Sequence, residues 1–231
     1  MKYNIFYTPG KGDVVFIQFT ITLSIYLVSI LGINMLAPKL IADKSIESLK
    51  QTINSLKANE EVFKALLKKQ PYYETHDCDS IIRFGNANSK LRITVLSNLY
   101  CNPCAKMHKR IEELLKKINN DISVQYILSS FEERLNLTNK YLIAAFLANE
   151  PCFALQVLNN WFEKGKELRE DFFKEMGLGL ENPEIEVEFQ KHEMWKKNTL
   201  IKGTPTVLVN DYKLPDSYKI EDLHYFIDLD L

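Results

Sequence analysis

Two cysteines close together in the chain carry its most distinctive chemistry. Cys101 and Cys104 form a Cys-x-x-Cys pair, with Asn102 and Pro103 between them. In thiol–disulfide exchange one thiolate attacks a disulfide, and a second thiol must then reach the mixed disulfide that forms. This spacing lets the second thiol do so without backbone movement. We therefore predict that Cys101 is the nucleophile and that Cys104 resolves the mixed disulfide.

The residues around the pair predict a strand followed by a helix. Residues 91–96 are apolar and rich in β-branched side chains, as in a buried strand. Cys101 would then lie at the first turn of the helix, where unpaired backbone N–H groups and the helix dipole stabilise a thiolate. Pro103 suits that turn because it has no N–H to leave unpaired. Apolar residues recur afterwards at the spacing of one helical face, at Cys104, Met107, Ile111, Leu114, Leu115 and Ile118.

Two other uses of these thiols stay open at this point: a metal site and inert structural thiols. A structural zinc site needs four ligands, and the sequence has no second Cys-x-x-Cys pair. His108, one turn after Cys104, could join the two thiols in a soft site that handles Cu(I) or zinc. Alternatively, His108 lies at the edge of the buried helix face and supports the site without a metal. We favour this second interpretation and expect neither a metal nor a cofactor.

The Cys-Asn-Pro-Cys pair between strand and helix resembles the centre of a thioredoxin fold. Residues 98–108 (NLYCNPCAKMH) and 202–210 (KGTPTVLVN) resemble the thioredoxin-like domain fused to the C-terminus of some bacterial vitamin K epoxide reductase family proteins. The resemblance covers about residues 80–231. It implies a cis bond between Thr204 and Pro205, in a loop that faces the dithiol, with Thr204 offering backbone groups to an extended substrate segment. A non-catalytic binding module with the same fold remains the alternative.

The resemblance also implies partners and a location. It points to protein thiols and disulfides outside the cytoplasm as substrates, and to a vitamin K epoxide reductase-like membrane protein as electron partner. The other membrane helices of such a fusion, with their cysteines, are not in this sequence, so we do not expect quinone chemistry within the chain. Neither oxidation nor reduction is favoured. Because Asn102 and Pro103 place no cation between the cysteines, we expect an intermediate redox potential.

The first part of the chain predicts a membrane anchor. Residues 14–36 carry no charge and are mostly apolar, and a helix needs about 20 such residues to cross a hydrocarbon core. A cleaved signal peptide fits less well, because the run is long and has no clear small-x-small cleavage site; a buried helix is the other alternative. We predict a tail over 1–13 and an uncleaved transmembrane helix over 14–36. Charge alone does not decide its orientation, because lysines flank both ends: Lys2, Lys11, Lys39, Lys44 and Lys50.

An amphipathic helical linker is predicted over residues 37–79. Its apolar positions recur at a spacing of three and four residues, with Glu60 interrupting the series, and Pro71 ends the helix. Such a stripe could pair two chains weakly, or it could pack against its own domain, which we consider the better interpretation. Its members are Ile46, Leu49, Ile53, Leu56, Phe63 and Leu67.

Composition limits the remaining function classes. The chain has 231 residues, 46% of them hydrophobic, which is enough for one full domain and an appendage. Lys and Arg total 29 against 30 Asp and Glu, so no basic excess predicts nucleic-acid binding. Four cysteines are too few for a disulfide-dense scaffold. Cys78 and Cys152 are either idle buried thiols or, in an oxidising compartment, a second disulfide.

The rest of the pattern predicts an α/β domain over 80–231. Short strands are expected at 81–84, 122–128, 207–209 and 212–214, the last two joined by an Asn210-Asp211 hairpin turn. A helical insertion is expected over about 131–200, where substrate choice could reside, and a closing helix over 220–229. The predicted fold class is therefore thioredoxin-like, with a helical insertion, preceded by one transmembrane helix and a helical linker.

Overall fold

The computed structural model describes residues 10–231, except 119–120, 149–150, 166 and 168–169. The side chain of Cys152 and most of the predicted tail 1–13 lie outside the described residues, and so does the predicted Cys78–Cys152 pairing. The chain divides into two compact units, residues 1–55 and 56–231, which are described separately.

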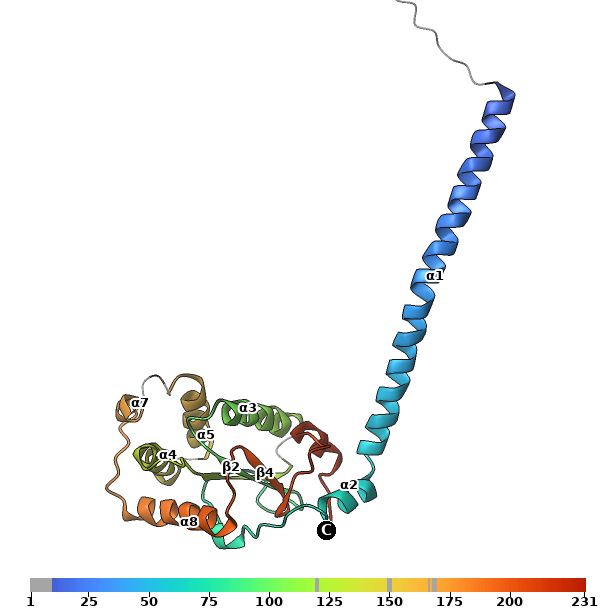
Figure 1. Cartoon of the computed structure of the whole chain (residues 1–231). Helices are drawn as coiled ribbons and strands as arrows, with labels where there is room; N and C mark the ends of the chain where they lie inside the picture. Colours follow the sequence, from blue (N-terminus) through green and yellow to red (C-terminus); the bar gives the residue numbers. More distant parts are fainter. Residues whose placement is uncertain (1–9, 119–120, 149–150, 166, 168–169) are drawn as a thin grey trace, which may run out of the picture. The chain divides into compact units, whose positions relative to one another are not determined.

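The first unit consists of one long helix, α1 (Lys11–Lys57), whose last two residues belong to the second unit (Figure 1). The helix continues through Pro38, so the predicted transmembrane run and the start of the predicted linker form one element. Its hydroxyl side chains donate to carbonyls one turn earlier, as Thr22 does to Gln18 at 2.7 Å and Ser29 to Ile25 at 2.8 Å. The hydroxyl residues in this apolar run therefore satisfy their hydrogen bonds within the helix. The helix is long and apolar enough to cross a membrane, and it contains an 18-residue stretch with a mean hydropathy of 2.2.

A five-stranded sheet forms the centre of the second unit, in the order β1-β3-β2-β4-β5. Strands β2 and β3 are parallel, and the other pairs are antiparallel. The carboxyl ends of β2 and β3 therefore meet the start of β4 at one edge of the sheet. The five predicted strand regions form strands, with bounds shifted by one or two residues. The strands are β1 (Arg83–Gly85), β2 (Arg92–Ser97), β3 (Ser123–Leu128), β4 (Thr206–Val209) and β5 (Tyr212–Lys213).

Alternation along the strands gives the sheet two different faces. One face carries large apolar side chains, such as Ile93, Val95 and Val207, and packs against α3 (Asn102–Lys117). The other face carries Leu96 and Leu208 among polar residues. That second face is covered by α8 (Pro183–Thr199) and the 3₁₀ turn η1 (His76–Cys78), so α3 and α8 lie on opposite sides of the sheet (Figure 1).

The predicted helical insertion is a series of helices between β3 and β4. It contains the 3₁₀ turn η2 (Glu133–Leu135), α4 (Asn136–Ala148), α5 (Pro151–Asn160), the π-helical turn η3 (Trp161–Gly165), α7 (Glu170–Glu175) and α8. Trp161 is fully buried and its ring stacks on Phe173, with centroids 5.0 Å apart. A Cβ on Gly165 would lie 2.4 Å from the Trp161 ring, so only glycine lets the ring take this position.

The two ends of this unit pack against each other. Helix α2 (Glu60–Leu67) is capped by Asn59, whose Oδ1 accepts the Val62 N–H at 3.0 Å, and Phe63 and Leu67 are fully buried. Phe63 stacks on Phe226, with ring centroids 4.1 Å apart. The apolar residues of α2, which the sequence assigned to the linker, thus belong to the core of the compact unit.

The closing segment is a 3₁₀ helix, η4 (Ile220–Tyr225), rather than the predicted helix over 220–229. Its apolar residues recur every third position, and a 3₁₀ helix has three residues per turn, so all of them face the core. Residues of this stripe are exposed by 1% or less: Ile220, Leu223, Phe226 and Leu229.

Candidate active site

The dithiol lies at the edge of the sheet where β2 ends. Cys101 is the N-cap residue of α3, with an extended backbone (φ −87°, ψ 122°), and its carbonyl accepts the Ala105 N–H. Cys101 is partly exposed, whereas Cys104 is 1% exposed. The pair therefore combines one accessible thiol at a helix N-terminus with one thiol beneath it.

Asn98 shapes the turn between the strand and the helix. Its side-chain oxygen accepts the Tyr100 N–H at 2.9 Å, and its carbonyl accepts the Cys101 N–H at 3.1 Å. Its own N–H donates to Cys104 Sγ at 3.4 Å. The spacing of the cysteines gave no signal for Asn98, although Asn commonly bonds to the backbone of a tight turn.

The loop before β4 lies beside the dithiol. The Thr204–Pro205 bond is cis, as predicted, and Cys101 Sγ lies 3.6 Å from the Thr204 carbonyl oxygen. Antiparallel pairing of Leu96 with Thr206 brings this loop to the end of β2. Thus Cys101, Cys104, Thr204 and Pro205, separated by about a hundred residues of chain, meet at one edge of the sheet.

The two thiols have different electrostatic surroundings. Burial raises the pKa of the Cys104 thiol above its ordinary value, and the neighbouring Cys101 adds to the rise. Hydrogen bonds from the Asn98 N–H and the Thr204 side chain partly offset this effect on the pKa. Cys104 therefore needs help to lose its proton, because its thiolate would be poorly solvated.

His108 lies deeper in the fold than its predicted place at the edge of the helix face, with 5% of its surface exposed. Nδ1 lies 2.8 Å from the Tyr126 hydroxyl and Nε2 lies 2.6 Å from Asn159 Oδ1. Both ring nitrogens are thus engaged by side chains other than the cysteines. Among the described residues, no three His, Cys, Asp or Glu side chains are grouped as a metal site.

Aromatic contacts tie the dithiol loop to the helical insertion. The Trp161 indole N–H donates to the Leu99 carbonyl at 3.0 Å, and the Trp161 ring meets Tyr100 edge to face. The Tyr100 hydroxyl lies 2.6 Å from Thr138 Oγ1 of α4. Sequence periodicity marked Trp161 only as an apolar core residue, because its polar partner lies in a distant loop.

The surface around the dithiol is partly apolar. Asn102 and Pro103 are exposed beside Cys101. Phe131, which follows β3, is 47% exposed, and Leu200, which precedes the cis-proline loop, is 76% exposed. Both residues have a positive φ, of 34° and 56°. Phe131 follows the carboxyl end of β3 and Leu200 precedes β4, so both belong to segments whose strands end at the dithiol's edge of the sheet.

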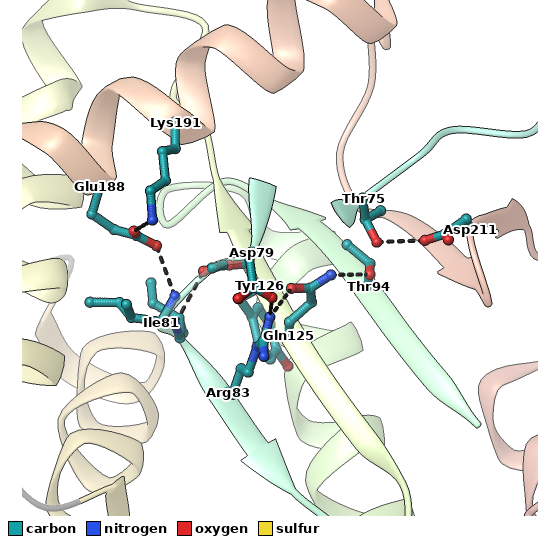
Figure 2. Close-up of polar contacts among 12 residues, drawn as sticks. Thr75, Asp79, Ile81, Arg83, Thr94, Gln125, Tyr126, Glu188, Lys191 and Asp211 are labelled. Carbon is teal, nitrogen blue, oxygen red and sulfur yellow. Dashed lines mark hydrogen bonds and ion pairs between the residues drawn. The ribbon is translucent and has the colours of Figure 1, made fainter. Parts of the chain in front are cut away.

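The opposite face of the sheet holds a polar network (Figure 2). Glu188 of α8 accepts the Ile81 N–H at 2.8 Å and pairs with Lys191, while Gln125 donates to Thr94 at 2.8 Å. Burial alone would raise the pKa of Glu188, but hydrogen bonds from His192, Lys191 and the Ile81 N–H lower it to about 2.

One family model and several solved structures match this chain. A family model described as Thioredoxin matches residues 78–229. A linker-deletion mutant of Proteus mirabilis ScsC is 16% identical, with 96% of each chain covered and a TM-score of 0.55. The catalytic domain of the same protein is 18% identical, covering 71% of this chain and 96% of its own, with a TM-score of 0.53. Oxidised BdbD from Bacillus subtilis is 13% identical, covering 68% of this chain and 95% of its own, with a TM-score of 0.50.

At these identities the structural matches establish the fold alone, and no curated protein matches the chain. The fold is the thioredoxin-like α/β fold with a helical insertion, as predicted. Because the family model covers more than half of the chain, including the dithiol and the cis-proline loop, this chain belongs to the thioredoxin family.

Proposed function

We propose that this chain is a membrane-anchored thiol–disulfide oxidoreductase whose redox centre is Cys101 and Cys104. One observation carries the proposal: a partly exposed thiol at the N-terminus of α3, a buried thiol one turn below it, and a cis-proline loop beside them. Unpaired N–H groups and the dipole at a helix N-terminus favour the thiolate form that attacks disulfides.

The reaction runs in two exchange steps. The Cys101 thiolate attacks a substrate disulfide, so that a bond forms between Cys101 Sγ and one substrate sulfur while the substrate S–S bond breaks and a thiolate leaves. Cys104 then attacks Cys101 Sγ, which forms the Cys101–Cys104 disulfide and releases the second substrate thiolate. The substrate gains two electrons and the enzyme loses two. The reverse sequence oxidises a substrate dithiol.

Substrate placement falls to the cis-proline loop and its apolar surroundings. Thr204 directs its carbonyl towards Cys101 Sγ, so an extended chain that pairs with the Thr204 backbone would bring its disulfide to the same sulfur. Phe131 and Leu200 offer apolar contacts nearby. Asn102 and Pro103 place no charge between the two cysteines. This is consistent with an intermediate redox potential of the dithiol and with substrate proteins of either positive or negative charge.

The proposed location is a membrane with the catalytic domain outside the cytoplasm. Helix α1 supplies the apolar span, and the sequence resemblance to bacterial fusion proteins supports both the orientation and a vitamin K epoxide reductase-like membrane partner. A membrane-impermeant maleimide added to intact cells should label the chain through Cys101. Labelling that appears only after the cells are lysed would contradict this orientation.

The alternative interpretation of the apolar stripe on α1, a weak dimer of two chains, can be tested directly. Ile46, Leu49 and Ile53 are each at least half exposed and recur at the three-four spacing of a two-stranded seam. Ile53→Lys should shift the full chain in mild detergent from dimer to monomer in light-scattering measurements. A wild-type chain that is monomeric at all concentrations would exclude the dimer.

The function is tested by exchange with glutathione disulfide and with insulin, using the full chain in detergent. Cys101→Ser should abolish exchange, whereas Cys104→Ser should accumulate a mixed disulfide through Cys101 that mass spectrometry detects. Cys78→Ser is the matched control, because Cys78 is buried on the other face of the sheet, and it should exchange at the wild-type rate. Exchange that survives Cys101→Ser would overturn the proposal.

A further inference from the structure

We propose that a groove along α8 binds an apolar segment of the substrate polypeptide while Cys101 attacks the disulfide of that polypeptide. The inference rests on the proposed function and deepens it. It adds a binding surface on the α8 side of the sheet to the cis-proline loop. The substrates that this surface favours are proteins whose cysteine is flanked by an exposed apolar segment.

The groove lies between α8 and residues 72–74, and its volume is about 930 Å³. Val187, Gln190, Met194 and Asn198 line it from the helix. Residues three or four positions apart lie on the same face of a helix, so one face of α8 forms this wall. The groove therefore follows α8 for about three turns.

The opposite wall of the groove is held in place by hydrogen bonds. The Tyr73 N–H donates to the Asp211 carbonyl at 2.8 Å, and Tyr72 forms a β-bridge with Tyr212 of β5. The Trp195 indole N–H donates to the carbonyl of residue 74 at 2.7 Å, which ties this wall to α8. The groove is therefore formed before a ligand arrives, and binding does not have to order its walls.

Large apolar side chains are exposed on both walls. Val187 is 60% exposed and Met194 is 62% exposed on α8, and Tyr72 is 54% exposed on the facing segment. Covering such side chains removes apolar surface from water, which favours binding. A ligand gains this free energy only when it brings apolar side chains of its own.

The charged residues of the groove favour the same kind of ligand. Two of the three that line it are paired within the chain. Glu186 pairs with Lys140 at 2.7 Å, and Lys191 pairs with Glu188 at 2.8 Å (Figure 2). A strongly charged ligand would have to compete with these ion pairs, whereas an apolar segment leaves them intact.

One end of the groove lies at the dithiol's edge of the sheet. Helix α8 ends at Thr199, which lines the groove. Lys196, in the last turn, has its Nζ 4.9 Å from the centre of the Phe131 ring, and Phe131 follows the carboxyl end of β3. The cis-proline loop is at this edge too, where Cys101 Sγ lies 3.6 Å from the Thr204 carbonyl oxygen. A polypeptide bound at the dithiol can therefore continue into the groove.

The length of the groove indicates which part of a substrate it receives. From Thr199 back to Val187 the helix rises by about 18 Å. An extended chain covers about 3.3 Å per residue, so about six residues span this length. The apolar segment is therefore separated from the substrate cysteine by several residues and is not the residue next to it.

Two synthetic peptides test the groove, and each carries one cysteine as a mixed disulfide with 5-thio-2-nitrobenzoate. In one peptide, alternate residues about four to ten positions on either side of the cysteine are leucine; in the matched peptide they are serine. The reduced full chain is held in lipid nanodiscs, so that no detergent fills the groove. At low peptide concentration the coloured thiolate should be released about tenfold faster from the leucine peptide.

The ratio of the two release rates reports binding in the groove, because both peptides present the same cysteine and the same leaving group. Val187→Asp and Met194→Asp each place a charge among the apolar side chains and should bring this ratio close to one. Val62→Asp is the matched control, because Val62 is also an exposed valine, on α2 and not among the residues of the groove, and it should keep the wild-type ratio. Thermal unfolding checks that each variant is folded.

Three results would overturn the inference. Equal release rates from the two peptides in the wild type would show that an apolar segment gives no advantage. An undiminished ratio in both groove variants would show that the segment binds elsewhere. Light scattering that shows a wild-type dimer which Val187→Asp dissociates would assign the groove to a second copy of the chain. A wild-type chain that reacts with neither peptide nor glutathione disulfide would instead overturn the proposed function, so the two failures are distinguishable.

Discussion

Each face of the sheet holds a buried histidine, and the two differ in what surrounds them. His108, on the α3 face, contacts a tyrosine hydroxyl and an amide and lines a cleft. His192, on the α8 face, is fully buried; its Nδ1 accepts the Leu128 N–H at 3.3 Å, and its Nε2 lies 3.2 Å from Glu188. His192 is held by the backbone and a carboxylate, which suits a fastening role. His108 is held by two neutral side chains, those of Tyr126 and Asn159.

The two histidines share residue type and burial but differ in the charge of their partners: His108 meets neutral side chains, whereas His192 lies beside a carboxylate. On the α8 face, the buried Glu188 carboxylate accepts the Ile81 N–H and pairs with Lys191 (Figure 2). These contacts fix the insertion on the sheet. On the α3 face, the His108 ring forms its hydrogen bonds with two neutral side chains, Tyr126 and Asn159. Changes to the α8 network should therefore alter stability without altering the exchange chemistry.

The largest expected effect comes from Glu188→Ala. The substitution leaves the Ile81 N–H and His192 without their carboxylate partner in a buried position, which should lower the free energy of unfolding by about 3 kcal/mol. Urea unfolding measures the loss, and the rate of the resolving step should not change. A slowed resolving step in a folded variant would break the distinction between the two faces.

Acid sensitivity should follow from the same carboxylate. The pKa of Glu188 is lowered from 4.5 to about 2 in the folded chain, so its stabilising effect is complete above about pH 4.5. That effect is lost as the pH falls towards 2, by roughly 3 kcal/mol in all. Unfolding measured from pH 5 to pH 2 should show this fall in the wild type and a smaller one in Glu188→Gln. Equal pH dependence in the two proteins would contradict the assignment.

Tyr126→Phe should have an intermediate effect on stability. It removes one hydrogen bond and leaves the buried His108 Nδ1 without its partner, which should cost about 1 to 2 kcal/mol. In the same urea titration this variant should therefore lose less stability than Glu188→Ala. A loss as large as that of Glu188→Ala would contradict the greater weight assigned to the carboxylate network of the α8 face.

Thr94→Val should have the smallest effect. It removes the hydrogen bond that Gln125 donates across the α8 face, worth about 1 kcal/mol, while it keeps the size of the side chain. Both exchange steps, attack by Cys101 and resolution by Cys104, should retain their wild-type rates. A change in either step would mean that the polar network on this face affects the dithiol.

Local patterns predicted most of the fold and the centre of the site. The strand before Cys101, the helix after it and the Asn210-Asp211 turn follow from short-range rules, and both turn residues have the positive φ that such a turn needs, of 45° and 73°. The cis bond at Pro205 came from the family resemblance, because base rates alone favour trans.

The supporting contacts could not be predicted in the same way. Tyr126, Asn159 and Trp161 reach the site from three different elements, and their partners are set by how those elements pack. Hydrophobic periodicity assigns such residues to a core without saying which polar group each one meets. The closing segment differs from its predicted helix over 220–229 for a related reason. Apolar residues at every third position suit a 3₁₀ helix, but in a short segment they are easily mistaken for one face of an α-helix.

The hydrogen bond from Trp161 to Leu99 also provides an optical readout of this enzyme. The chain has two tryptophans. Trp161 touches the loop that carries the thiols, whereas Trp195 donates to Glu74 on the far side of the sheet. Formation and reduction of the dithiol's disulfide should therefore change the fluorescence of Trp161 alone, and Trp195→Phe leaves a chain whose emission follows its own redox state.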